Sequence, residues 1–317
     1  MGKLFETEAR VAFIGDSITH NGRAVAYIQE YYRTHLPERR VRIYNLGIGG
    51  DTAAGANTRM DEILSVRPTE AVVMFGVNDM GVGYYEKETP TEEHLGLRAE
   101  RCRVHLEATV RLVERLHELS IPVTLCSAVG RDEHTPDAAG TMTYGATDAL
   151  LAMYHANLAA APADAIKNTV DYLSPLQALL ERVAAMGGPT LFAPDRTHPS
   201  PLGQAMMARI FLRAQGLPVE LPSAELLCAG WREAELSPIL RERLSVEGAW
   251  RDLHFVYPHQ RNLCGEVPLA ERIAFFAERA KITEPGYIRN MFDYYVANAH
   301  REDELFQSYM KLTEELY

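Results

Sequence analysis

The chain has 317 residues, 47% hydrophobic and 24% charged, with a formal net charge of −11 at pH 7. These values are typical of a globular protein and exclude a low-complexity or disordered chain. The negative charge argues against a nucleic-acid partner and against an anionic membrane surface. It favours a neutral or small-molecule substrate over a polyanion. Since no apolar run is long enough to span a bilayer, we expect no membrane anchor.

The start of the chain and the cysteines both bear on location. The first residues lead directly into a predicted strand, without the apolar core of a signal peptide. The four cysteines are far apart and form no C-x-x-C pair, which favours reduced thiols. We therefore expect a cytoplasmic protein.

Strand and helix patterns alternate over the first two thirds of the chain. Short apolar runs rich in β-formers predict strands, and amphipathic segments between them predict helices. The predicted strands cover residues 10–15, 41–46, 70–75, 121–127 and 168–172, and the predicted helices cover residues 23–36, 53–64, 93–119, 147–160, 175–186 and 202–214. This order predicts a three-layer α/β/α sandwich with a parallel sheet and right-handed crossovers.

The pattern changes after Leu217, where strand alternation largely gives way to helical patterns separated by prolines. We therefore predict an α/β domain over residues 1–217 and a mostly helical extension over residues 218–317. Aromatic residues are frequent in the three amphipathic helices predicted at residues 270–281, 285–297 and 303–317. Core packing is their most common use; a dimer surface or a cover over the active site are the alternatives. An aromatic-rich helical extension can also bury itself against a second copy, so we expect a homo-oligomer.

Ser17 follows the first predicted strand, in the sequence Gly15-Asp16-Ser17-Ile18. In open α/β sheets, ligands bind outside the carboxyl ends of the strands, so a serine here would face the crevice. Asp16 or Ser17 could instead simply cap the next helix, which is a common role of both residue types.

Polar groups suited to acyl transfer follow other predicted elements. His198 could act as a general base for Ser17, and Asp195, three residues earlier, could orient its imidazole. Gly50, Asn78 and the Ser17 N–H could donate hydrogen bonds to an oxyanion. Each of these signals alone is more typical of a turn or a helix cap, but their joint occurrence at successive strand ends favours catalysis.

Four blocks of sequence, at residues 15–18, 50–52, 76–79 and 195–198, resemble the signature blocks of the SGNH (GDSL-type) hydrolases. The resemblance covers roughly residues 8–216. It implies a flavodoxin-like fold and serine esterase activity without a metal or other cofactor. It also implies a triad of Ser17, His198 and Asp195, and an oxyanion hole of Ser17, Gly50 and Asn78. Ile18 replaces the usual leucine, and the last hundred residues match nothing in the family core.

The substrate we expect is a short acyl ester, with an O-acetyl group on a carbohydrate as the first candidate. The loops at residues 80–85 and 130–139 are polar or aromatic, and no long apolar groove for a fatty chain is evident. A lipid esterase, lysophospholipase or thioesterase with the aromatic helices as its lid is the alternative within enzymes. The alternative outside enzymes is a catalytically silent binding protein on the same fold.

Overall fold

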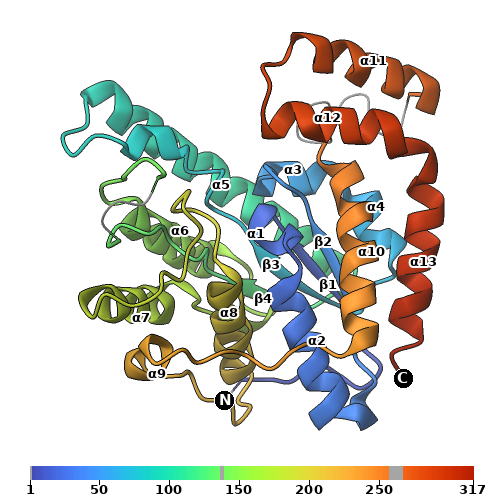
Figure 1. Ribbon diagram of the computed structural model, residues 1–317, viewed down its shortest axis with the longest axis horizontal. Coiled ribbons are helices and arrows are strands. Elements are labelled where there is room, and N and C mark those ends of the chain that lie inside the picture. Colours follow the sequence, from blue (N-terminus) through green and yellow to red (C-terminus); the bar gives the residue numbers. More distant parts are fainter. Residues whose placement is uncertain (1, 136–138, 257–266) are drawn as a thin grey trace.

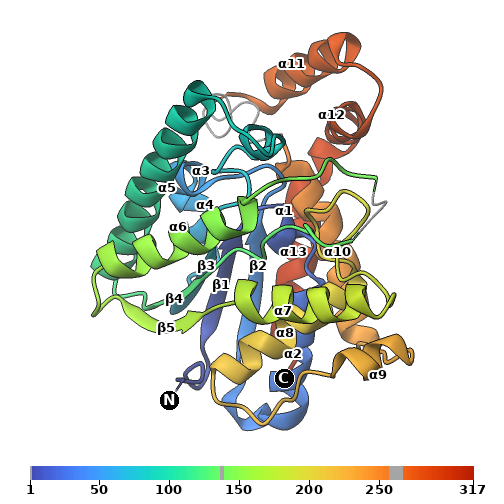
Figure 2. The same cartoon turned by 90° about the vertical axis from the view of Figure 1, so that its left-hand side faces the viewer.

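The computed structural model describes residues 2–135, 139–256 and 267–317. Its centre is a five-stranded parallel sheet with the strand order β2-β1-β3-β4-β5 (Figures 1 and 2). The strands are β1 (Arg10–Gly15), β2 (Arg42–Gly47), β3 (Glu70–Met74), β4 (Val123–Cys126) and β5 (Ile166–Val170). Helices cover both faces, so the predicted three-layer sandwich is confirmed.

Alternate residues of each strand are buried in opposite layers of the core. Phe13 packs toward α2 (Arg23–His35), α7 (Leu173–Ala185) and α8 (Pro201–Ala214). The next residue, Ile14, packs on the other side of the sheet. That side is covered by α3 (Ala53–Thr58), α4 (Met60–Ser65) and α5 (Glu92–Glu118), and also by α10 (Pro238–His254) and α13 (Glu302–Glu314). Burial on both faces explains why the strands are nearly continuous apolar runs.

The remaining helical segments are shorter or more peripheral. They are α1 (Ser17–His20), α6 (Ala146–Ala160), α9 (Ala224–Cys228), α11 (Leu269–Ile282), α12 (Tyr287–Asn298) and the 3₁₀ turns Pro37–Arg39, Val82–Tyr85 and Ala299–Arg301. In the described part of the chain, no helix has both the length and the apolar character needed to cross a membrane.

The strand order places the carboxyl ends of three strands together. After β1 the chain adds β2 on one side, and it later adds β3 on the other side. Gly15 at the end of β1 is in register with Gly47 of β2 and Met74 of β3. The segments that follow these strands therefore meet at the switch point of the sheet, where open α/β folds bind ligands.

Several elements differ from the prediction: the fourth strand is shorter, covering Val123–Cys126, and the helix α10 was not predicted. The helix predicted over residues 53–64 is interrupted at Arg59, whose φ of −121° and ψ of 34° are not helical. At this break the Arg59 guanidinium lies 2.8 Å from a carboxylate oxygen of Asp51, and both side chains are buried. The fifth strand covers Ile166–Val170 and so begins two residues earlier than predicted.

The C-terminal helices share a core with the sheet. Trp250 on α10 and Tyr309 on α13 are buried in the same apolar cluster as Ile14 and Tyr44. The Tyr309 hydroxyl also accepts a hydrogen bond from the backbone N–H of Asn45 on β2, at 2.9 Å. The predicted boundary at residue 217 stays a prediction, but apolar packing crosses it.

The aromatic residues of the last three helices serve mainly as packing. Phe276 contacts the rings of both Phe292 and Tyr295, and all three are almost fully buried. Tyr287, at the start of α12, differs because 64% of its surface is exposed. In Figure 1, α11 and α12 project at the top of the molecule, beyond the α1 and α3 end of the sheet. The predicted homo-oligomer stays a prediction.

Candidate active site

Ser17 is held at the carboxyl end of β1 by a short, tightly packed turn. The carboxylate of Asp16 accepts the N–H of Ile18 at 2.9 Å and caps α1, of which Ser17 is the first residue. Glycines allow α1 to lie directly on the strand ends. A Cβ at Gly15 would lie 2.2 Å from the Thr19 hydroxyl, and one at Gly47 would lie 2.2 Å from the His20 nitrogen.

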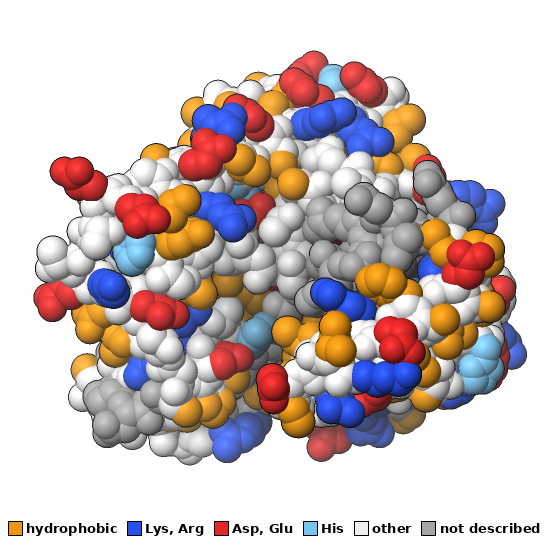
Figure 3. All heavy atoms as spheres, turned by 90° about the horizontal axis from the view of Figure 1, so that it is seen from above, with side chains coloured by type: hydrophobic (Ala, Val, Ile, Leu, Met, Phe, Trp, Pro, Cys, Tyr) orange, Lys and Arg blue, Asp and Glu red, His pale blue; other side chains and the backbone are white. Residues whose placement is uncertain are grey.

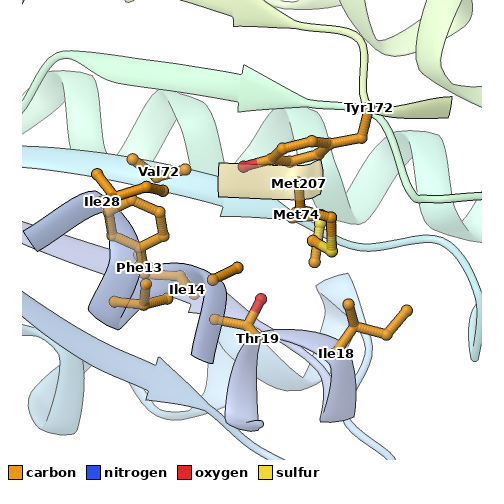
Figure 4. A pocket seen from close by; sticks show the side chains of 11 residues that line it. Phe13, Ile14, Ile18, Thr19, Ile28, Val72, Met74, Tyr172 and Met207 are labelled. Carbon is orange, nitrogen blue, oxygen red and sulfur yellow. The ribbon is translucent and has the colours of Figure 1, made fainter. Parts of the chain in front are cut away.

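A small apolar cavity lies beneath α1, between Ile18 and Thr19 on one side and the core on the other (Figure 4). Its volume is about 20 Å³, enough for about one water molecule. Phe13, Met74 and Tyr172 are among the residues that line it. The space beneath α1 is therefore almost completely filled.

His198 and Asp195 lie on a loop closed by a β-bridge between Phe192 and Pro199. The His198 Nε2 lies 2.7 Å from the Ser17 Oγ, and its Nδ1 lies 2.6 Å from an Asp195 carboxylate oxygen. The other carboxylate oxygen of Asp195 accepts the N–H groups of Thr197 and His198, at 2.9 and 3.0 Å. The three predicted side chains therefore form one continuous hydrogen-bonded chain.

Asp195 is held in its ionised form. Burial alone would raise the pKa of this carboxyl, but the hydrogen bonds from His198 and from the Thr197 N–H lower it below 3.8. A carboxylate beside Nδ1 favours the imidazole tautomer that carries its proton there. Nε2 then presents a lone pair to Ser17, which is the arrangement a general base needs to remove a hydroxyl proton.

Three N–H donors occupy the segments after β1, β2 and β3. Gly50 is exposed in a turn with a φ of +77°, a conformation that favours glycine. The Asn78 side chain donates one of its two N–H groups to the Asp51 carbonyl at 2.8 Å and keeps the other. Among the described residues, neither the Gly50 nor the Ser17 N–H donates a hydrogen bond. These groups can therefore stabilise a negative charge.

Two buried residues that support these loops were not predicted. Arg59 pairs with Asp51, directly after Gly50. His105 on α5 lies 3.1 Å from an Asp79 carboxylate oxygen, which also accepts the Ala53 N–H at 3.0 Å. His105 is only 2% exposed. It could have been found as a histidine at an apolar position of an amphipathic helix, whereas nothing in the sequence pairs Arg59 with Asp51.

Arg196 anchors the loop that carries His198, and it also was not predicted. Its φ is +63°, which is uncommon for a residue with a side chain. Its guanidinium donates hydrogen bonds to the carbonyls of Gly140, Asp132 and Thr135. This link ties the His198 loop to the polar loop after β4, of which residues 136–138 lie outside the described part.

Asp16 is a strongly perturbed carboxyl of the site. Burial raises its pKa to about 7, and the neighbouring charges of Asp79 and Asp51 add to the effect, although the Ile18 N–H opposes it. A carboxyl of this kind carries a proton over much of the range in which an ordinary aspartate is ionised.

Two further histidines and a tyrosine close in sequence to these segments have other surroundings. His20 lies 3.0 Å from the Asp252 carboxylate on α10, and His134 is exposed. Tyr85 is buried beneath the Arg98 guanidinium, which lies 4.0 Å from the ring centroid. Seen from above in Figure 3, this end of the molecule is hollowed near its middle and carries interspersed acidic, basic and apolar side chains.

Comparison with known proteins places the chain among hydrolases of one family. The model of the GDSL-like lipase/acylhydrolase family matches residues 13–206. An acetylxylan esterase from Geobacillus stearothermophilus is 28% identical over 226 residues, which cover 65% of this chain and 94% of that protein.

Two solved structures show the likeness in fold. A gut microbial diltiazem-metabolizing enzyme has a TM-score of 0.73 at 19% identity, with 98% of this chain and 96% of that chain covered. A crystal structure of an acetylxylan esterase from Geobacillus stearothermophilus has a TM-score of 0.50 at 23% identity, with 67% of this chain and 96% of that chain covered. The first of these likenesses therefore extends through the C-terminal helices.

Proposed function

Because the chain belongs to the GDSL-like lipase/acylhydrolase family and is a carboxylic ester hydrolase, we propose that it cleaves short acyl esters through a Ser17-His198-Asp195 triad. The favoured substrate is an O-acetyl group on a carbohydrate. The observation that carries the proposal is the hydrogen-bonded chain from Ser17 through His198 to Asp195, with distances of 2.7 and 2.6 Å.

In the first half of the proposed reaction, His198 accepts the Ser17 proton while Oγ attacks the ester carbonyl. The N–H groups of Ser17, Gly50 and Asn78 stabilise the oxyanion of the tetrahedral intermediate. His198 then gives its proton to the alkoxide as the carbon–oxygen bond breaks, and the alcohol leaves. The product is an acyl group bound to Ser17.

In the second half, a water molecule takes the place of the alcohol. His198 accepts a proton from the water as its oxygen attacks the acyl carbonyl, and Ser17 leaves with that proton. Asp195 stabilises the imidazolium in both halves. Removing one oxyanion donor from such a site typically costs about 10²–10³ in kcat.

One comparison favours a short acyl group: the curated relative that is 28% identical is an acetylxylan esterase. The alcohol side of the substrate would lie in the hollow among polar loops, which suits a sugar better than a lipid.

The test is a comparison of kcat/KM for p-nitrophenyl acetate, butyrate and octanoate, followed by acetylated xylo-oligosaccharides. We expect the acetate to be the best of the three and the acetylated sugars to release acetate. A lysophospholipid and an acyl thioester serve as controls. Rates that rise with chain length from acetate to octanoate, or that are higher on the lipid or thioester, would overturn the acetyl-ester assignment.

A further inference from the structure

The end of α10 contacts the loop that follows β2. Phe255, directly after α10, is 4% exposed. A Cβ at Gly49 would lie 2.9 Å from the Cδ2 of Phe255, so the ring packs directly on the backbone of the residue before Gly50. The C-terminal region thus contacts the segment that carries one of the proposed oxyanion donors.

Glu62 on α4 provides a second, electrostatic connection between α10 and the same loop. Its Oε1 lies 2.7 Å from the Arg251 guanidinium and 3.0 Å from the Nδ1 of His254. Its Oε2 lies 3.4 Å from Arg59, and Arg59 lies 2.8 Å from the Asp51 carboxylate. A chain of alternating charges therefore runs from α10 through Glu62 to Asp51.

These charges are deeply buried. Arg251 is fully buried, and the side chains of Arg59, Asp51 and Glu62 are 7%, 2% and 13% exposed. Burial alone would raise the pKa of Glu62, but Arg251, His254 and Arg59 hold it well below 4.5. A buried charge that loses its partner of opposite sign is strongly unfavourable. Each member of the group must therefore stay close to the next one, and so constrains its position.

Asp51 transmits this constraint to the site in two ways. It directly follows Gly50, whose N–H is one proposed donor. Its carbonyl also accepts a hydrogen bond from the Asn78 amide at 2.8 Å, which fixes the orientation of the second donor. A shift of Asp51 would therefore move both donors relative to Ser17.

We propose that Glu62 is a positioning residue for ester hydrolysis, which couples the end of α10 to the oxyanion donors through Arg59 and Asp51. The inference rests on the proposed roles of Gly50 and Asn78. It gives the C-terminal helices a part in the reaction, although none of the four signature blocks lies in them.

The central test is Glu62→Gln in the full chain with p-nitrophenyl acetate. We expect kcat to fall roughly tenfold or more, because misplaced donors lose part of their effect on the transition state. KM should stay within about twofold, since an interaction made only in the transition state does not contribute to substrate binding.

Glu70→Gln is the matched control. Glu70 is also a buried glutamate with a cationic partner, Lys167 at 2.9 Å, but it lies at the opposite end of β3 from the site. This variant should lower the melting temperature without a comparable loss of kcat. Equal losses of kcat in the two variants would show a general effect of destabilisation and overturn the proposal.

Two further variants keep the test decisive. Phe255→Leu perturbs the apolar contact on Gly49 without unpairing a charge, and it should lower kcat several-fold. This variant replaces Glu62→Gln as the test of the coupling if Glu62→Gln does not fold. In an Asn78→Ala background, Glu62→Gln should cost less than it does in the wild type, because residues that act together are not additive. Full additivity of the two losses, or an unchanged kcat in Phe255→Leu, would contradict the coupling.

The proposed function and this inference can fail separately. If Asn78→Ala retains the wild-type kcat, the proposed oxyanion role is wrong. If Asn78→Ala loses activity while folded Glu62→Gln does not, the oxyanion role stands and only the positioning role of Glu62 is wrong.

Discussion

The segment that the family model matches and the helices after residue 217 use buried charge differently. Beneath the site, Asp16 is buried where the charges of Asp51 and Asp79 oppose its ionisation. On α10, the buried Arg243 and Glu247 lie 3.1 Å apart, and Arg251 lies 2.7 Å from Glu62. The first region thus keeps Asp16, whose ionisation its surroundings oppose, beside the reacting serine, whereas these charges on α10 lie beside partners of opposite sign. Both regions contribute to one core, and α10 contacts the loop after β2 through Glu62 and Arg59.

Trp250→Ala tests the supporting role of the C-terminal helices and should have the larger effect on stability. Trp250 is 3% exposed, and its ring centroid lies 5.2 Å from that of Tyr309 and 4.9 Å from that of Phe306. Removing a buried aromatic ring costs about 3–5 kcal/mol. Urea unfolding followed by circular dichroism should show that loss in a single transition.

The control is Trp231→Ala, at the only other tryptophan of the chain. Trp231 is partly exposed and has the Arg209 guanidinium 4.9 Å from its ring, so we expect a loss of about 1 kcal/mol. Two well-separated transitions in Trp250→Ala would show that the C-terminal helices and the sheet unfold independently. That result would contradict the supporting role of these helices.

Asp16→Asn tests the buried carboxyl beside Ser17. Its effect on the free energy of unfolding should be smaller than that of Trp250→Ala. The folded-state pKa of about 7 lies above the ordinary value of 3.8, so between these values the folded protein keeps a proton that the unfolded chain has lost. The Asp16 carboxyl therefore lowers the free energy of unfolding of the wild type as pH rises from about 4 to 7. Asparagine has no such titration and still accepts the Ile18 N–H.

The difference in unfolding free energy between Asp16→Asn and the wild type should therefore increase by about 2 kcal/mol from pH 5 to pH 8. Asp61→Asn, at an exposed acid on α4, is the control and should show little change. A difference that is constant or shrinks as pH rises would mean that Asp16 is ionised in the folded protein throughout.

The sequence allowed much of the fold to be predicted, because alternating apolar runs and helices specify a parallel sheet. It also allowed Ser17, His198 and Asp195 to be chosen, because short polar blocks at strand ends have few alternative uses in that combination. Arg59 and Glu62 could not be identified in this way. Their partners are set by tertiary packing, and a charged residue in an amphipathic helix is ordinarily a solvated one.

The most direct test of the proposed mechanism is labelling with a fluorophosphonate probe, with the modified residue mapped by peptide mass spectrometry. We expect the wild type to be labelled at Ser17, His198→Ala to be labelled far more slowly, and Ser17→Ala to be both unlabelled and inactive on p-nitrophenyl acetate. Labelling at a different residue, or ester hydrolysis that persists in folded Ser17→Ala, would contradict the assignment of Ser17 as the nucleophile.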